Sequence, residues 1–258
     1  MPNAPQRVPD AAQRSLWFTP PDGAESRRRA LTRERVVAEA LTVIAVDGAG
    51  ALSMRALAAR LGVVPGALYR HVRSKEQLCD LVVDGVLAEV DLQAGRDLAW
   101  TGRVAALARA LQTVLEDHPG IAALLKTRDP LGPHSLALAE AFLTALREAG
   151  LPRRETALAF SLIYDYTLGF ALSDRTTVNE QRVQDPATRS QLHDFFRSLP
   201  ADRFPALTVL GEYIWADNRD ERFTAALDTL LAGLQAARRR PRSQPPARSD
   251  DSKRGGPS

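Results

Sequence analysis

The stretch from Met54 to Val72 restricts the fold of this chain more than any other part of the sequence. It holds two short helical patterns joined at Gly62, a residue that tolerates positive φ and therefore permits a tight turn. Pro65 opens the second pattern, and proline suits the first turn of a helix because no hydrogen bond needs its missing N–H there. The positions expected to fill the space between the two helices are Leu57, Ala58, Leu61, Val63 and Leu68. This arrangement is typical of a helix-turn-helix.

Charged and polar residues near this turn favour a nucleic-acid ligand. Two short helices of an ordinary bundle would explain the apolar positions equally well, but they would leave Tyr69-Arg70-His71 and Lys75 without a role. Residues 32–75 carry seven basic and three acidic side chains, whereas residues 76–91 carry five acidic side chains and no basic one. A DNA duplex attracts the first segment and repels the second. We therefore predict a DNA-binding helix-turn-helix.

We predict an all-α fold, because the sequence from residue 32 to residue 237 is mostly helical in pattern and shows no sustained alternation typical of strands. Thr32, Ser53 and Ser74 predict three helix starts, since their hydroxyls can accept hydrogen bonds from free backbone N–H groups. Gln77 completes a capping box with Ser74.

The helix-turn-helix residues resemble those of the tetracycline-repressor (TetR) family. The matching positions are Gly48, Leu52–Leu57, Ala58, Leu61–Val63, Leu68–Val72 and Lys75. Later positions are similar to the family's tetracycline-repressor-like C-terminal domain, namely Trp100, His118-Pro119-Gly120, Gly132-Pro133, Gly150-Leu151 and Leu168-Gly169-Phe170. The resemblance covers residues 31–175 well. It implies a homodimeric transcriptional regulator, of the repressor class, that binds double-stranded operator DNA and is released by a small-molecule inducer.

By this resemblance, the second helix lies in the major groove and a homodimer reads two half-sites of a palindrome. Tyr69, His71 and Lys75 would contact phosphates, and Arg55 would reach a guanine edge. The residues that lead the second helix are small and apolar, so they can touch thymine methyl groups but form no bidentate bonds, and DNA shape supplies the remainder. The predicted DNA-binding residues are Met54, Arg55, Val64, Pro65, Gly66, Ala67, Tyr69, Arg70, His71 and Lys75. The alternatives are solvated charges for Arg55 and Lys75 and a core position for Tyr69.

The predicted domain order follows from these patterns. Its parts are a disordered arm at 1–31, a DNA-binding domain at 32–92 with its motif at 54–73, a ligand-binding and dimerisation domain at 93–237 that includes a mobile section near 174–190, and a disordered basic tail at 238–258. Residues 153–172 are apolar on every side of a predicted helix, and such a helix must be buried all round. By the resemblance, this helix and one at 219–237 pair with their copies in a four-helix bundle. The alternative is an intramolecular core.

Aromatic residues of the second domain are candidates for a pocket that takes a largely apolar ligand with one or two polar groups. The predicted set is Trp100, His118, Phe142, Tyr164, Asp165 and Phe170, and core packing is the alternative for its aromatic members. The family's founder holds a magnesium–drug chelate through positions that correspond here to Leu124 and Ser173, and neither binds a metal. We therefore expect no metal, no cofactor and no magnesium–tetracycline ligand. Inducer binding is expected to swing the long helix that starts near Trp100.

Other classes of protein fit the sequence poorly. The four histidines show no metal-ligand spacing, no glycine-rich phosphate loop is present, and Cys79 has no evident base partner, so we predict no catalytic residues and no enzyme. The chain has no apolar stretch of the roughly 20 residues that a spanning helix needs and no signal-peptide pattern, which favours a cytoplasmic protein without a membrane partner. The remaining alternative is a ligand-independent DNA-binding protein, or an activator, of the same fold.

Overall fold

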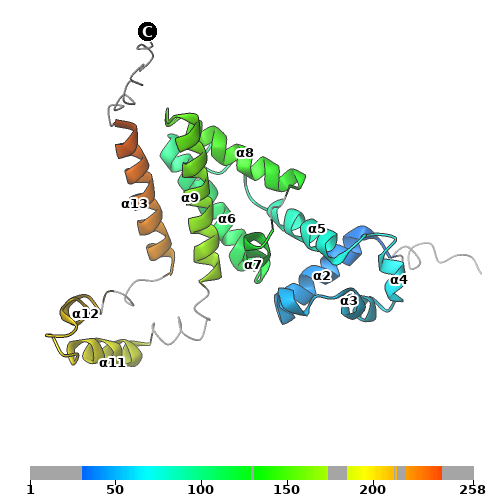
Figure 1. The fold of residues 1–258 in the computed structure, drawn as a ribbon, viewed down its shortest axis with the longest axis horizontal. Helices are drawn as coiled ribbons and strands as arrows, with labels where there is room; N and C mark the ends of the chain where they lie inside the picture. Colours follow the sequence, from blue (N-terminus) through cyan, green and yellow to red (C-terminus); the bar gives the residue numbers. More distant parts are fainter. Residues whose placement is uncertain (1–30, 129–130, 174–184, 212, 214–218, 240–258) are drawn as a thin grey trace, which may run out of the picture. The chain divides into compact units, whose positions relative to one another are not determined.

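The structure is a computed structural model that describes residues 31–128, 131–173, 185–211, 213 and 219–239. All regular secondary structure in these ranges is helical, which confirms the predicted all-α fold (Figure 1). The predicted arm and basic tail lie almost entirely outside the described residues, as does most of the section near 174–190. Contacts divide the chain into two units, Met1–Leu78 and Cys79–Ser258, and each is described by itself.

The first unit is a small helical domain. Its elements are α2 (Arg33–Asp47), η2 (Ala49–Ala51), α3 (Met54–Leu61), α4 (Pro65–Leu68) and the first turn of α5 (Lys75–Leu87). Thr32 begins α2 as predicted, because its hydroxyl accepts a hydrogen bond from the backbone N–H of Arg35 at 3.2 Å. The buried apolar side chains of this unit are Val36, Ala40, Val43, Ile44, Leu52, Leu57, Ala58, Leu61, Leu68, Val72 and Leu78.

The second unit is built around three long helices. Its elements after α5 are α6 (Trp100–Asp117), α7 (Ile121–Lys126), α8 (Pro133–Arg147), α9 (Arg153–Leu172), α11 (Pro186–Arg197), α12 (Pro205–Leu210) and α13 (Arg219–Arg239). Helices α6, α8 and α9 pack against one another, α7 packs on α9, and α13 packs on α9 and α6 (Figure 1). Helices α11 and α12 pack against each other.

The first turns of α13 are fixed to the end of α9. Arg219 donates hydrogen bonds to the carboxylate of Glu116, at 2.8 Å, and to the carbonyl of Phe170, at 3.1 Å, and its guanidinium lies 4.8 Å from the centre of the Phe170 ring. The Phe223 ring stacks on Tyr166 with centroids 5.3 Å apart. The Tyr166 hydroxyl donates to the Phe223 carbonyl at 3.0 Å. Two stretches far apart in the sequence are therefore joined by both polar and aromatic contacts.

One face of α9 is left uncovered by the described residues. Ile163 and Thr167 are fully buried, whereas Leu158 and Leu162 are 52% and 44% exposed. The apolar helix predicted at 153–172 is thus buried where it packs against α6, α7, α8 and α13, and it is not buried all round by the described residues. The leucine-rich stripe of α13 packs inside its own chain, where Phe223, Leu227 and Leu231 are buried.

The N-terminus of α8 is capped by a side chain from another helix. Gly132 occupies the N-cap position and offers no side-chain hydrogen bond, and Pro133 follows it. Asp84 of α5 accepts hydrogen bonds from the backbone N–H groups of His134 and Ser135, both at 3.0 Å, and from the Ser135 hydroxyl at 3.1 Å. A Cβ at residue 132 would collide with the Asp84 carboxylate. Helix α8 therefore depends on α5 for the cap that most helices find in their own sequence.

Replacing Asp84 by Ala should destabilise the protein, because two backbone donors and one hydroxyl lose their acceptor. We expect a loss of about 1–3 kcal/mol in the free energy of unfolding, measured by urea denaturation followed by circular dichroism. Asp97→Ala is the control, since Asp97 is exposed and makes no hydrogen bond or ion pair with the described residues. Equal stability of the two variants would contradict the proposed cap.

Candidate nucleic-acid interface and ligand pocket

The predicted turn between the two short helices is present. Ser53 caps α3, and its hydroxyl accepts a hydrogen bond from the N–H of Ala56 at 3.1 Å. Gly62 ends α3 with φ +69° and ψ +31°, a left-handed conformation that glycine adopts at no steric cost. The N–H of Val63 then donates to the carbonyl of Ala58 at 3.0 Å, which satisfies the end of α3. The sequence-predicted role of Gly62 is confirmed by this geometry.

Helix α4 presents its leading residues to solvent. Leu68 is fully buried and fixes the helix to α3, whereas Val64 is 71% exposed and Pro65 and Gly66 are also exposed. Helix α4 is a single turn of four residues. Beyond it the chain continues as a hydrogen-bonded turn, with the N–H of Val72 donating to the carbonyl of Leu68 at 3.0 Å. Buried apolar contacts thus hold an exposed, small and apolar edge in place.

The residues after α4 supply polar groups beside this edge. Tyr69 is 53% exposed and so is not a core aromatic, while His71 and Lys75 are half-buried. Lys75 is the first residue of α5, whose start is fixed by two hydrogen bonds. The N–H of Gln77 donates to Ser74 at 3.2 Å, and the Gln77 side chain accepts from the N–H of residue 73 at 2.6 Å, one residue earlier than in the predicted capping box.

The basic side chains of the first unit fall into two groups. Arg60 donates to the carboxylate of Glu39 at 2.6 Å, a hydrogen bond that raises the pKa of the Arg60 guanidinium, and Arg33 donates to a backbone carbonyl. The side chains of Arg55 and Arg70 are exposed and make no hydrogen bond or ion pair with the residues that the structure describes. The first group stabilises the fold, and the second is available to a ligand. Met54 and Ala67, the remaining predicted DNA contacts, are half-buried.

The predicted pocket residues of the second unit do not form one cluster. Phe142 is fully buried and its ring lies 6.1 Å from that of Phe160, which stacks on Tyr164 at 5.6 Å. Burial, helped by the charge of Asp165, raises the pKa of Tyr164 to about 12. The Tyr164 hydroxyl has no hydrogen-bond partner among the described residues. This aromatic row joins α8 and α9, and Phe160 is a member that the sequence did not single out.

The other predicted residues lie elsewhere. Phe170 belongs to the cluster that fixes α13, and Trp100 is buried at the start of α6. His118 is hydrogen-bonded to Glu89 at 2.8 Å, and Asp165 is exposed. Three of the four therefore have a structural partner or a core position within the chain.

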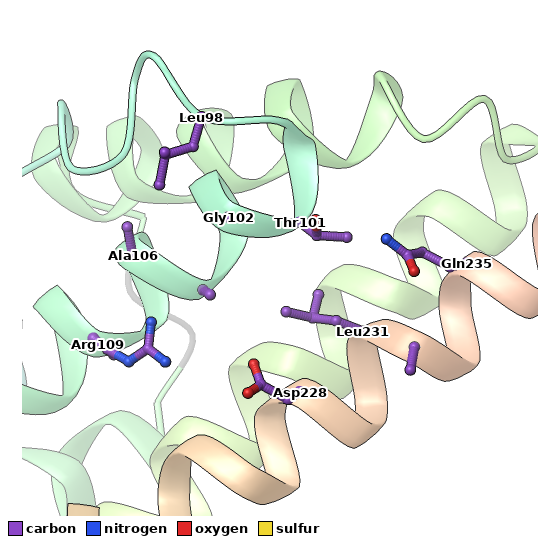
Figure 2. Close-up of a pocket in the computed structure, with 10 residues that line it drawn as sticks. Leu98, Thr101, Gly102, Ala106, Arg109, Asp228, Leu231 and Gln235 are labelled. Carbon is purple, nitrogen blue, oxygen red and sulfur yellow. The ribbon is translucent and has the colours of Figure 1, made fainter.

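A pocket of about 390 Å³ lies between α6 and α13 (Figure 2). Leu231 and Ala105 are buried members of its lining, and the exposed Arg109 and Asp228 lie on opposite helices. Its lining consists of Leu98, Thr101, Gly102, Ala105, Ala106, Arg109, Asp228, Leu231, Ala232 and Gln235. None of the predicted pocket residues is among them. The signal that sequence reasoning missed is the run of glycine and alanine on one side of α6, which leaves space beside a neighbouring helix.

The comparison with known families decides the class of protein. The model described as "Bacterial regulatory proteins, tetR family" matches residues 36–82, and the model described as "Tetracyclin repressor-like, C-terminal domain" matches residues 94–238. The chain belongs to the TetR family. It is therefore a DNA-binding transcriptional repressor with a ligand-binding C-terminal domain, and not an enzyme.

TetR-family relatives cover most of the chain. An HTH-type transcriptional regulator from Saccharopolyspora erythraea is 34% identical over 88% of this chain and 94% of its own length. The HTH-type transcriptional repressor DrrR1 from Streptomyces coeruleorubidus is 30% identical over 89% of this chain and 87% of its own length. Among solved structures, the TetR family protein ActR from Streptomyces coelicolor, in complex with (S)-DNPA, matches with a TM-score of 0.70 and 33% identity, over 80% of this chain and 98% of ActR.

The described residues of this TetR-family chain offer neither a metal cluster nor a membrane-spanning helix. No three His, Cys, Asp or Glu side chains in the described ranges gather as they would around a metal ion. No helix in those ranges is both long and apolar enough to cross a membrane.

The division of the arginines can be tested with a matched pair of variants. Arg55→Ala should lower the affinity for operator DNA by about tenfold or more, because arginine is the usual partner of a guanine edge, and should leave the free energy of unfolding unchanged. Arg60→Ala removes the same charge but breaks the contact with Glu39, so it should lower stability and affect DNA affinity less. Fluorescence anisotropy with labelled DNA gives the affinities. Equal losses of DNA affinity in the two variants would contradict the assignment of Arg55 to DNA binding and of Arg60 to stability.

Proposed function

We propose that this chain is a homodimeric repressor that occupies a palindromic operator and is released by a small, largely apolar ligand. The observation that carries the DNA-binding part is the exposed leading edge of α4, held by buried contacts and flanked by the available cations Arg55 and Arg70. A rigid short helix with an exposed edge is suited to enter the major groove. Because its operator is genomic DNA, we place the protein in the cytoplasm.

The proposed recognition of DNA combines few polar base contacts with several phosphate contacts. Arg55 reads a guanine, and Val64, Pro65, Gly66 and Ala67 touch thymine methyl groups, since their side chains carry no hydrogen-bonding group. Phosphates are contacted by Tyr69, Arg70, His71 and Lys75, and Met54 packs at the start of α3. Most of the binding free energy is then independent of sequence and sensitive to salt.

Homodimerisation is proposed through the exposed faces of α9 and α13. Leu158 and Leu162 expose about half of their area on α9. Gly169 on α9 and Gly233 on α13 are exposed helical glycines, and a Cβ on either would meet no atom within 4 Å. Small residues at such positions let two helices approach closely, and the apolar leucines favour a covered face. These features support a bundle of four helices formed with a second copy.

The ligand is proposed to be a planar aromatic molecule that contacts the half-buried Phe160 and Tyr164, in the row that the fully buried Phe142 completes. This row offers stacking surfaces and a half-buried phenol without a partner, a combination that fits a flat ligand with a few polar groups. The related ActR has been solved with actinorhodin, at 33% identity and a TM-score of 0.69. Trp100, His118, Asp165 and Phe170 stay candidate ligand contacts outside this row.

Release from DNA requires only that the ligand bind the DNA-incompetent state more tightly. Helix α6, which begins at Trp100, packs on α8, α9 and α13. A ligand beside α8 and α9 would therefore shift α6, and we propose that this movement changes the separation of the two α4 helices in the dimer.

Selection of bound sequences from a random DNA pool tests the DNA-binding proposal. The full chain should enrich one palindrome whose half-sites are centred about one helical turn, or a multiple of it, apart. Sedimentation of the purified complex should give a mass of two chains, or a multiple of two, for each operator. Enrichment of a single half-site would contradict the dimer, and enrichment of no sequence would contradict the repressor itself.

Actinorhodin is the probe for the ligand proposal. It should release the chain from the selected operator at concentrations at which tetracycline with Mg²⁺ does not, because Leu124 and Ser173 offer no metal ligand. Tyr164→Phe keeps the stacking ring and removes only the hydroxyl, so release should require a several-fold higher concentration. Electrophoretic mobility shifts give both curves. Identical release of the wild type and Tyr164→Phe would contradict the role of Tyr164, and no release by either compound would favour a ligand-independent protein.

A further inference from the structure

No contact or backbone conformation among the described residues explains why residue 66 is a glycine. It is the second residue of α4, and its backbone is not in the left-handed region, where Gly48 and Gly62 are found. It is exposed, and a Cβ built on it would meet no heavy atom within 4 Å. Neither backbone conformation nor close packing within the described residues therefore calls for a glycine here.

A glycine at this position is unfavourable for the helix itself. Glycine has more backbone freedom to lose than alanine, and this loss destabilises a helix. Helix α4 has only four residues, and its N-cap Val64 makes no side-chain capping hydrogen bond. Gly132 is different, because a Cβ there would collide with Asp84. The reason for Gly66 is therefore to be sought in what α4 binds.

The surroundings of Gly66 indicate which DNA group approaches it. Val64 is 71% exposed, and Pro65 is exposed beside it. We call Val64, Pro65 and Gly66 the α4 tip. No side chain of the tip carries a charge or a hydrogen-bond donor, so its side chains cannot bond to a phosphate or to a guanine edge. The methyl group of thymine is the apolar feature that the major groove offers to such a surface.

We propose that Gly66 is a specificity-determining residue whose missing side chain leaves room for one thymine methyl group in each half-site. This inference rests on the proposed DNA-binding function. A methyl group on residue 66 and the thymine methyl group would compete for the same space. Val64 and Pro65 then form the apolar walls around the thymine methyl group, and Gly66 sets how closely α4 approaches the base.

The test combines a protein variant with a DNA substitution. The operator is first selected with the wild-type chain, and each thymine of a half-site is then replaced singly, and symmetrically in both half-sites, by deoxyuridine, which lacks the methyl group. Gly66→Ala should bind the selected operator about tenfold or more weakly. One deoxyuridine substitution should restore most of that affinity to Gly66→Ala, while it weakens the wild type a few-fold.

Gly85→Ala is the matched control. Gly85 is also exposed, helical and without a neighbour within 4 Å of a built Cβ, but it lies on α5. Both variants should raise the Tm slightly, by about 2 °C, because alanine favours the helix. Only Gly66→Ala should lose operator affinity, so a loss of affinity cannot be assigned to misfolding.

The possible outcomes are distinct. Unchanged affinity of Gly66→Ala for the operator would overturn the inference. A loss of affinity that no single deoxyuridine relieves would also overturn it, because the added methyl group would then meet something other than a thymine methyl group. Failure of the wild-type chain to enrich any sequence would overturn the proposed function first, and the inference with it.

Discussion

The hydrogen bonds from the start of α8 to Asp84 fix the position of α8 relative to α5. Helix α8 packs on α6 and α9, but its own first residues, Gly132 and Pro133, cannot cap it. The carboxylate that does so comes from α5, some 50 residues earlier in the chain. Two more acidic residues of this region pair with basic partners, Asp80 with Arg128 and Glu89 with His118. The acidic cluster that follows the DNA-binding motif is thus partly structural.

In the first unit, a very short helix is held at the surface by contacts with its neighbours. Four residues cannot form a stable helix alone. Burial of Leu68 and the turn at Gly62 fix α4 instead, and they leave its leading edge exposed. Arg60 is paired with Glu39 inside the domain, whereas the side chain of Arg55 is free to contact DNA. Stability and recognition therefore use different side chains of the same small domain.

Local patterns in the sequence predict much of this fold. They do not predict contacts between residues that are distant in the sequence. The caps at Thr32, Ser53 and Ser74 and the turn at Gly62 depend on neighbouring residues, so they could be read directly. The α8 cap joins residues 84 and 135 and has no local signature. The six pocket residues are predicted from their side-chain type, which is mostly aromatic. Whether such residues lie together in the structure depends on how the helices pack. The pocket between α6 and α13 is lined partly by small side chains, which carry no chemical signal in a sequence.

The contacts of Arg219 and Phe223 with the end of α9 have a consequence for how this chain can change over evolution. They set the position of α13 from its first turns, whatever path the residues between the two helices take. Helices α11 and α12, which lie between α9 and α13 in the sequence, supply none of these contacts. Substitutions in α11 and α12 should therefore be tolerated without a change in the way in which α9 and α13 are paired.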